Sequence, residues 1–149
     1  MDIWYTLDDL SRVATQLLTT YGNQRIYTLE GELGTGKTTL VAELCRQLKV
    51  SEPVSSPTFS IVNEYRTAAG GTIHHLDCYR LESVEEAIEA GLEELLATAP
   101  ATTADAVFVE WPAVIEPLLP DRVVFLSLYH DPDGGGRRRL SINTGHPPS

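Results

Sequence analysis

Hydrophobic residues recur at helical spacing in three stretches of the chain. The first stretch ends at Gly22, the second follows Lys37, and the third follows Ser83 with Gly91 as a candidate break. Thr6 and Ser83 each have an acid three positions later, which is the spacing of a helix capping box. The three apolar faces are Leu10, Val13, Ala14, Leu17, Leu18 and Tyr21; Leu40, Val41, Leu44 and Leu48; and Ala87, Ile88, Leu92, Leu95 and Leu96. We therefore expect three helices.

Short apolar and β-branched runs between these stretches predict strands. The runs are residues 26–29, 60–66, 72–79, 106–109, 123–129 and 137–143. Turn-forming residues at 68–71 and 131–136 join four of the runs into two hairpins. The run at 106–109 is apolar at every position, as expected of a strand covered on both faces. The alternation predicts an α/β fold with a mixed central sheet flanked by helices.

The length and composition fit a single domain. A chain of 149 residues with a 42% hydrophobic share can bury one core, so we expect residues 1–149 to form one domain with a frayed tail at about 144–149. A small-residue linker is expected at 97–105. No apolar stretch reaches the roughly 18 residues that span a bilayer, and the N-terminus lacks the basic start of a signal peptide. Cys45 and Cys78 are too few for a disulfide framework. These features predict a cytoplasmic protein without membrane contact.

The charge of the chain argues against extensive direct contact with nucleic acid. Eleven basic and 21 acidic residues leave a formal charge of −10, which repels a phosphate backbone from most of the surface. The exception is a basic patch where Arg137, Arg138 and Arg139 follow three glycines. We favour a solvated patch, because runs of charge usually face water. Contact with phosphate or with an acidic face of a partner is the alternative.

A glycine-rich loop carries the clearest chemical signal. Residues 31–38 fit the phosphate-loop pattern G-x-x-x-x-G-K-[ST] at every fixed position, and they lie between a predicted strand and a predicted helix. In such a loop the glycines let backbone N–H groups turn toward the phosphates of a nucleotide. Lys37 would supply charge to the β- and γ-phosphates, and the Thr38 hydroxyl would hold Mg²⁺. The motif predicts a nucleotide-binding site.

Two acidic residues are candidates to complete a magnesium site. Besides the loop, Mg²⁺ needs a carboxylate at the end of a neighbouring strand, bound directly or through water. Glu110 follows the apolar run at 106–109 and is the leading candidate. Asp77 shares one face of a predicted strand with His75 and Tyr79. It either reaches the metal or is a solvated or capping residue at the strand end, and the spacing favours neither interpretation.

Two other chemistries fit the sequence poorly. A zinc site of His74, His75, Cys78 and Cys45 matches no common ligand spacing. A GTPase would need an Asn-Lys-x-Asp motif, which the chain lacks, since its two lysines stand elsewhere, at positions 37 and 49.

Four ordered motifs resemble those of one family, the bacterial ATPases called TsaE, formerly YjeE. The motifs are Gly-Glu-Leu-Gly-Thr-Gly-Lys-Thr-Thr at 31–39, Ser-Pro-Thr-Phe at 56–59, His-Leu-Asp-Cys-Tyr-Arg-Leu at 75–81 and Val-Glu-Trp-Pro at 109–112, with Leu-Pro at 119–120. The resemblance covers most of the chain. This family acts in making threonylcarbamoyladenosine next to the anticodon of tRNA. The turn at 134–139 and the Pro-containing tail depart from the family pattern, and we expect neither to touch the motifs.

The resemblance implies a small α/β phosphate-loop fold that binds ATP and Mg²⁺ and hydrolyses ATP slowly on its own. It implies Lys37, Glu110 and Asp77 as catalytic residues, with Thr38, Glu110 and Asp77 around the metal. The residues implied to hold the nucleotide are Gly34, Thr35, Gly36, Lys37, Thr38, Thr39 and Thr58. Thr58 would lie on a switch loop that orders with the γ-phosphate. Trp111 either packs near the site or is a buried structural residue.

The resemblance also implies two protein partners, TsaB and TsaD, with tRNA contacted only through their complex. TsaD performs the carbamoyl transfer, so ATP turnover by this chain would gate or reset the TsaB–TsaD complex. A rival function is a small-molecule kinase, which would use the same loop with residues 137–139 as a lid. Another is a non-hydrolytic sensing module, in which Thr58 reports the bound nucleotide without turnover.

Overall fold

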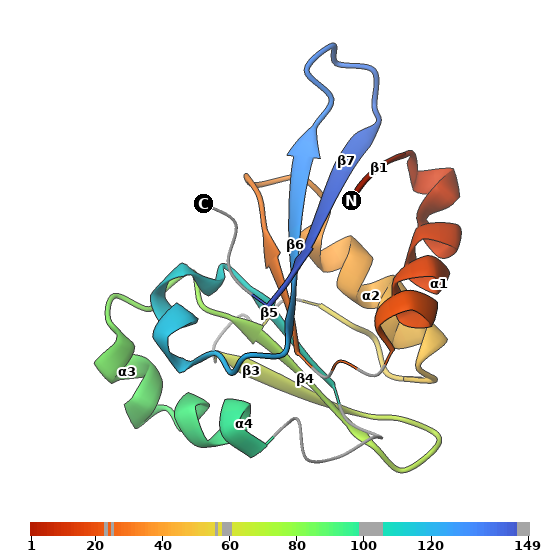
Figure 1. Ribbon diagram of the computed structural model, residues 1–149. Coiled ribbons are helices and arrows are strands. Elements are labelled where there is room, and N and C mark those ends of the chain that lie inside the picture. The colour runs from red at the N-terminus through yellow and green to blue at the C-terminus, as the bar shows by residue number, and fades with distance from the viewer. Residues whose placement is uncertain (23, 25, 56, 58–60, 99–105, 146–149) are drawn as a thin grey trace.

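Parallel strands form the centre of a seven-stranded sheet in the computed structural model, which describes residues 1–22, 24, 26–55, 57, 61–98 and 106–145 (Figure 1). The strand order is β1-β7-β6-β2-β5-β4-β3. β2 (Ile26–Glu30) lies between β5 (Ala106–Glu110) and β6 (Val123–His130) and is parallel to both. β4 (Thr72–Asp77) is parallel to β5 on its other side. The carboxyl ends of β2, β4 and β5 therefore meet at one edge, where the loop motif and both acidic candidates lie.

Antiparallel strands extend the sheet on both sides. β3 (Val62–Arg66) pairs with β4, and β7 (Arg138–Thr144) lies between β6 and β1 (Asp2–Tyr5). The predicted mixed sheet and both predicted hairpins are confirmed. β1 was not predicted, because its four residues carry too short a pattern to distinguish a strand. Its pairing with β7, which is remote in the sequence, places it in the sheet.

Helices cover both faces of the sheet. α1 (Leu10–Tyr21) and α2 (Lys37–Gln47) pack on one face, whereas α3 (Val84–Glu89), α4 (Leu92–Thr98) and the 3-10 helix η3 (Pro112–Leu118) pack on the other (Figure 1). Within the described residues, no helix is long and apolar enough to cross a membrane.

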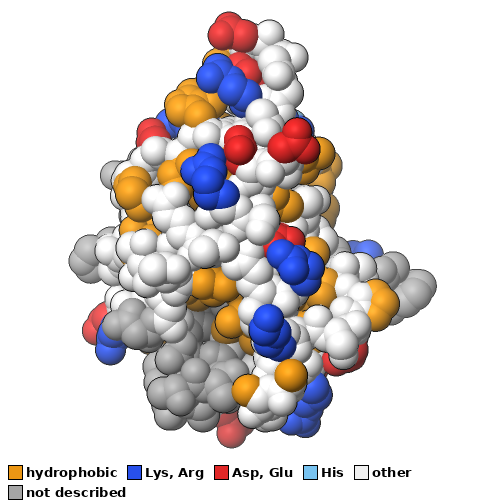
Figure 2. All heavy atoms as spheres, turned by 90° about the vertical axis from the view of Figure 1, so that its right-hand side faces the viewer, with side chains coloured by type: hydrophobic (Ala, Val, Ile, Leu, Met, Phe, Trp, Pro, Cys, Tyr) orange, Lys and Arg blue, Asp and Glu red, His pale blue; other side chains and the backbone are white. Residues whose placement is uncertain are grey.

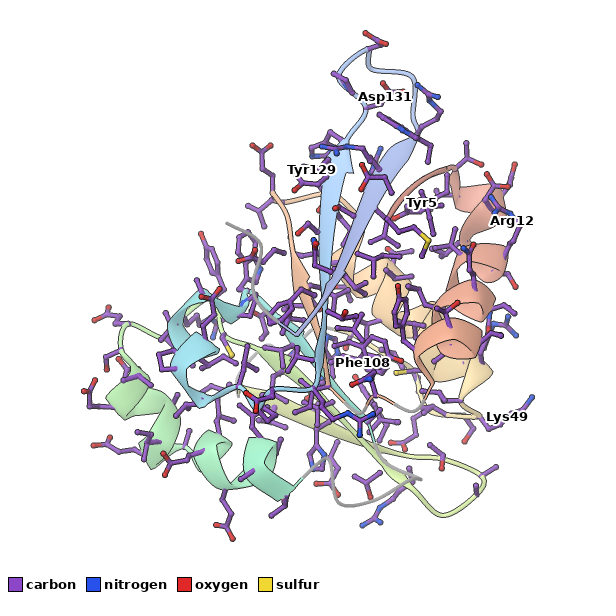
Figure 3. The ribbon with its side chains drawn as sticks, viewed as in Figure 1. Tyr5, Arg12, Lys49, Phe108, Tyr129 and Asp131 are labelled. Carbon is purple, nitrogen blue, oxygen red and sulfur yellow. The ribbon has the colours of Figure 1, made fainter. Side chains whose placement is uncertain are left out.

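The alternation of side chains along β5 explains its uninterrupted apolar run. Phe108 points into the core beneath α1 and α2, while Val107 and Val109 point into the core beneath α3 and α4. Figure 3 shows Phe108 near the middle of the sheet. Each such fully buried side chain stabilises the fold by about 1.5–3 kcal/mol. The prediction that this strand is covered on both faces is confirmed.

The predicted signals at helix ends are largely confirmed. Thr6 and Asp9 form a capping box at the 3-10 turn η1 (Leu7–Asp9), which leads directly into α1. The Ser83 hydroxyl caps α3 by accepting a hydrogen bond from the Glu86 amide at 3.3 Å. Gly91, with φ of 86°, separates α3 from α4, so the third predicted helix is two short ones.

Several predicted boundaries were wrong by a few residues. β4 ends at Asp77, two residues before its predicted end, because Cys78 to Leu81 form a turn closed by the Leu81 amide. α4 continues to Thr98 and takes up the start of the predicted linker, whose residues 99–105 lie outside the described ones. Thr144 belongs to β7, so the predicted tail starts too early, and residues 146–149 lie outside the description.

Candidate functional site

The glycine-rich loop connects the end of β2 to the start of α2. Gly34 and Gly36 adopt φ of 79° and 93°, a left-handed conformation that residues with a Cβ rarely adopt. Gly31 is required for another reason, since a Cβ there would lie 2.5 Å from the Leu128 carbonyl oxygen. The amide and hydroxyl of Thr35 both donate to the Glu32 carbonyl, which closes a turn inside the loop. The sequence motif thus corresponds to a tightly curled loop at a helix N-terminus.

Lys37 is the first residue of α2, and its ammonium group is folded back onto this loop. Its Nζ donates to the carbonyl oxygens of Gly31 at 2.6 Å and Glu32 at 3.0 Å, and it lies 4.1 Å from the centre of the Trp111 ring. Burial lowers the pKa of Lys37 below its usual value, while the charges of Glu110 and Asp77 oppose that shift. The loop therefore holds a poorly hydrated cation at the helix N-terminus, which favours an anion.

Glu110, the last residue of β5, is the centre of a buried polar cluster. Its side chain is almost completely buried. The Thr38 hydroxyl donates to this carboxylate, with Oγ1 3.0 and 2.9 Å from its two oxygens. Nε2 of His75 lies 2.5 Å from Oε2 of the same carboxylate. The predicted proximity of Thr38 and Glu110 is confirmed, but the contact with His75 was not foreseen.

Asp77 lies directly beside Glu110, because the two residues are partners in the parallel register of β4 and β5. Its Oδ1 accepts a hydrogen bond from the Tyr79 amide at 3.0 Å, so it caps the strand end as one interpretation held. It also faces Lys37 closely enough to influence the pKa of that residue, and it lines the same cavity as Lys37 and Glu110. The capping interpretation is confirmed, whereas contact of Asp77 with a metal stays a prediction.

A cavity of about 270 Å³, here called the loop cavity, brings most of the predicted residues together. Its lining residues are Leu33, Gly34, Gly36, Lys37, Thr38, Thr39, Asp77, Glu110 and Trp111. Thr35 does not line it, because its side chain is turned into the loop. Thr58 lies outside the described residues. The site thus contains two carboxylates and a hydroxyl, the oxygen ligands that Mg²⁺ prefers.

Trp111 lines the loop cavity. Its backbone has φ of 58°, and its amide donates to the Leu29 carbonyl at 3.2 Å, which anchors it next to the loop strand. Its ring packs at a tilt of 57° against the Tyr79 ring, with 4.9 Å between centroids. Because it is only partly buried and contacts Lys37, it packs near the site rather than serving as a buried structural residue.

A projecting hairpin, the β6–β7 arm, touches the loop from the other side. The arm comprises residues 129–139 and extends beyond the sheet at the top of Figure 3, where Tyr129 and Asp131 are labelled. Nε2 of His130 lies 3.2 Å from the Leu33 carbonyl oxygen, and Arg138 donates to the Gly34 carbonyl at 3.4 Å. The expectation that the turn at 134–139 leaves the motifs untouched was therefore wrong, because Arg138, at the start of β7, contacts the loop.

Of the other two arginines of the arm, Arg137 is exposed and Arg139 is partly buried, and both are paired. Arg137 contacts Asp131 at 3.2 Å and lies over the Trp4 ring, while Arg139 contacts Asp2 at 3.3 Å. Figure 2 shows basic and acidic side chains together on this projection. The favoured solvated patch is thus only partly right, since the guanidinium groups also have acidic or aromatic neighbours. A second cavity, of about 970 Å³, lies between the arm, the loop and Trp111.

The zinc hypothesis is wrong for a structural reason. Cys45 packs in the core beneath α1 and α2, whereas Cys78 packs in the core on the opposite face of the sheet. His75 is bound to Glu110, and the described part of the chain holds no group of three or more His, Cys, Asp or Glu side chains suited to a metal. Both cysteines are free and buried, and burial raises the pKa of each thiol to about 12.

Comparisons with known proteins agree with the resemblance in the sequence. A family model described as threonylcarbamoyl adenosine biosynthesis protein TsaE matches residues 5–140. The tRNA threonylcarbamoyladenosine biosynthesis protein TsaE of Rickettsia bellii is 33% identical over 122 residues, 81% of this chain and 80% of that protein. Its counterpart from Rickettsia conorii is 31% identical over 140 residues, 93% of this chain and 75% of that protein. The Nostoc protein of the same name is 51% identical over a shorter match of 65 residues, which spans 44% of this chain and 39% of the relative.

A solved structure shares the fold. The crystal structure of YdiB from Bacillus subtilis superimposes with a TM-score of 0.68 at 22% identity, covering 98% of this chain and 87% of that one. The matched family model spans nearly the whole chain, and its match includes the loop, Asp77 and Glu110. The chain therefore belongs to the TsaE family of threonylcarbamoyl adenosine biosynthesis proteins.

Proposed function

We propose that this protein is a Mg²⁺-dependent ATPase that supports threonylcarbamoyl modification of the adenosine next to the tRNA anticodon. The observation that carries the proposal is the convergence of Lys37, Thr38 and Glu110 on one curled loop at the carboxyl ends of parallel strands. Ligands of α/β sheets bind at this edge, and a helix N-terminus with a buried ammonium suits a triphosphate.

The residues of the loop would bind the phosphates by exchanging their present hydrogen-bond partners for phosphate oxygens. Lys37 now donates to the carbonyls of Gly31 and Glu32, and both bonds can be replaced by bonds to phosphate oxygens. The first backbone N–H groups of α2 point toward the helix N-terminus, which is where a helix binds an anion. The charge that burial leaves poorly hydrated on Lys37 makes this exchange favourable.

The oxygen groups in the loop cavity fit a magnesium ion. Mg²⁺ is usually held by one or two carboxylates together with phosphate oxygens and water, and Thr38, Glu110 and Asp77 offer that set. The ion would neutralise charge on the phosphates when bound. Glu110 would hold it directly or through a water, and the Thr38 hydroxyl would turn from Glu110 toward the metal.

The pathway of the family supports a role in a complex. We propose that TsaB and TsaD are the partners, that tRNA is contacted through them, and that ATP turnover gates or resets their complex. A chain with a net charge of −10 does not need an extended basic face if its partners hold the RNA. We place the reaction in the cytoplasm, where tRNA is modified.

Nucleotide titration with and without the partners tests this function. Calorimetry should show saturable binding of MgATP, weaker binding when EDTA removes the metal, and little binding of GTP. Phosphate release should be slow for the chain alone and should rise when TsaB and TsaD are added. A metabolite phosphorylated by the chain alone would instead establish a small-molecule kinase. Absence of any saturable heat with MgATP, even beside both partners, would refute the proposal.

A further inference from the structure

His75 is buried in the middle of β4 next to the proposed catalytic carboxylate. Its side chain is completely buried, and its Nε2 lies 2.5 Å from Oε2 of Glu110. In the parallel register, Phe108 is the partner of His75 and Asp77 is the partner of Glu110, so His75 and Glu110 are diagonal neighbours on adjacent strands. Two adjacent, hydrogen-bonded parallel strands therefore hold the pair together.

Packing alone does not explain a histidine at this position. An imidazole loses its hydration on burial, and an apolar side chain would fill the same space without that cost. The neighbouring His74 points to the other face of β4, where it is partly exposed and lies 3.6 Å from Glu64. What distinguishes His75 is its hydrogen bond to Glu110, so the bond accounts for the polar residue.

The surroundings of the ring determine the direction of this hydrogen bond. Nδ1 of His75 is buried and has no hydrogen-bond partner among the described residues. A buried N–H without an acceptor costs more than an unused lone pair, so the proton belongs on Nε2. His75 is thus a donor to Glu110, through Nε2–H.

The bond from His75 differs from the bond made by Thr38. Thr38 would turn its hydroxyl toward a metal ion in the nucleotide complex, so its contact with Glu110 changes in the reaction cycle. His75 is fixed by the β4–β5 ladder, and its contact need not change. His75 can therefore keep the Glu110 carboxylate oriented after the Thr38 hydroxyl has moved.

We propose that His75 is a positioning residue that orients the Glu110 carboxylate for Mg²⁺. The proposal rests on the function proposed above. Hydrogen-bond partners of metal-binding groups fix the geometry of those groups, and their loss typically lowers metal affinity or activity by about 10- to 100-fold. His75 should therefore control the metal-dependent part of nucleotide binding, whereas the bonds from the loop amides and Lys37 should not depend on it.

Two substitutions separate positioning from packing. His75→Leu replaces the donor with an apolar side chain of similar size. His75→Gln keeps an N–H donor near the position of Nε2. His74→Leu, on the opposite face of the same strand, is the matched control. For each variant, calorimetry measures ADP affinity with Mg²⁺ and with EDTA, a turnover assay measures the Mg²⁺ requirement, and thermal unfolding confirms the fold.

We expect His75→Leu to lower turnover by about 10- to 100-fold and to raise the Mg²⁺ concentration needed for half-maximal turnover. Affinity for ADP in EDTA should stay within about twofold, because the loop contacts remain. His75→Gln should recover most of the loss, and His74→Leu should match the wild type. A folded His75→Leu variant with normal turnover and normal Mg²⁺ dependence would overturn the proposal, as would a Gln variant no better than Leu.

The tautomer gives a test that needs no activity. A long-range ¹H–¹⁵N spectrum of the wild-type protein should show His75 protonated on Nε2 and bare on Nδ1. A proton on Nδ1 instead of Nε2 would refute the role proposed for His75, but it would not contradict the proposed ATPase function. Conversely, a wild-type protein that binds no nucleotide would reject the proposed function itself, before any variant is compared.

Discussion

The loop cavity and the β6–β7 arm both concentrate charged side chains, but they hold them in opposite environments. In the loop cavity, Lys37 is 5% exposed and Glu110 is 2% exposed. On the arm, the side chains of Arg137 and Arg139 are 50% and 34% exposed. Removing the hydrogen-bond partner of such a buried charge typically costs about 3–5 kcal/mol, because the charge is left uncompensated. An exposed pair contributes about 0–1 kcal/mol. The difference teaches that charge count alone does not identify the site, whereas burial with matched partners does.

The largest effect is expected from Glu110→Gln, which keeps the shape of the buried side chain but removes its charge. Turnover should fall by at least about 100-fold, because the residue that we assign to Mg²⁺ loses its charge and a neutral amide binds the ion less well than a carboxylate. ATP binding should persist through Lys37 and the loop. Phosphate release and tRNA modification in the presence of TsaB and TsaD are the measurements. Exposed Glu64→Gln serves as the control, and modification at the normal rate by Glu110→Gln would favour the sensing module over the ATPase.

Lys37→Ala should abolish tight nucleotide binding. Loss of one buried, charged hydrogen-bond partner costs about 2–5 kcal/mol, which corresponds to at least roughly 30-fold in affinity. Lys49→Ala is the matched control, because this exposed lysine follows the far end of α2 (Figure 3). Calorimetry with MgATP compares the two, and unchanged affinity in Lys37→Ala would place the binding determinant elsewhere.

Thr38→Ala should have a smaller and more selective effect. It removes the hydroxyl that contacts Glu110 and that we assign to Mg²⁺, so affinity for MgATP should fall by about tenfold while affinity in EDTA changes little. Thr38→Ser keeps the hydroxyl and should bind normally. Equal losses with and without Mg²⁺ would assign Thr38 to the phosphates or to the fold instead of the metal.

The smallest effect is expected on the arm. Arg138→Ala removes a long, exposed contact to the Gly34 carbonyl, so MgATP affinity should weaken by no more than about fivefold, or 1 kcal/mol. Arg12→Ala, on the exposed side of α1, is the control for loss of one surface arginine (Figure 3). A loss of the size expected for Lys37→Ala would show that the arm belongs to the binding site and would remove the contrast between the two regions.

Local patterns in the sequence predicted the elements that surround the loop well. The two glycines with left-handed φ and Lys37 stand at fixed spacing, and their roles in shaping the loop depend on neighbours within a few residues. The same holds for β5, whose apolar run predicted that both faces of the strand are buried. The end of β4 was misplaced because the turn after Asp77 still carries apolar residues and looks like a longer strand.

Contacts between distant segments escaped the sequence patterns. The sequence placed His75 on the same strand face as Asp77, within a family motif and in a poorly fitting zinc site, but it assigned no role to His75 beside Glu110. Recognising it required the register that pairs Asp77 with Glu110. The contact of Arg138 with Gly34 joins residues more than a hundred positions apart and depends on how the hairpin twists.

The sequence by itself determined the phosphate loop, the alternation of helices and strands, and the family, because these depend on residue types at short, fixed spacings. Only the tertiary structure decided that His75 donates to Glu110, that β1 completes the sheet edge and that the arm touches the loop. Those features depend on strand order and register, which set which remote side chains share one small, poorly hydrated space. Burial in that space, more than residue identity, strengthens the electrostatic interactions of the few charged groups in the loop cavity.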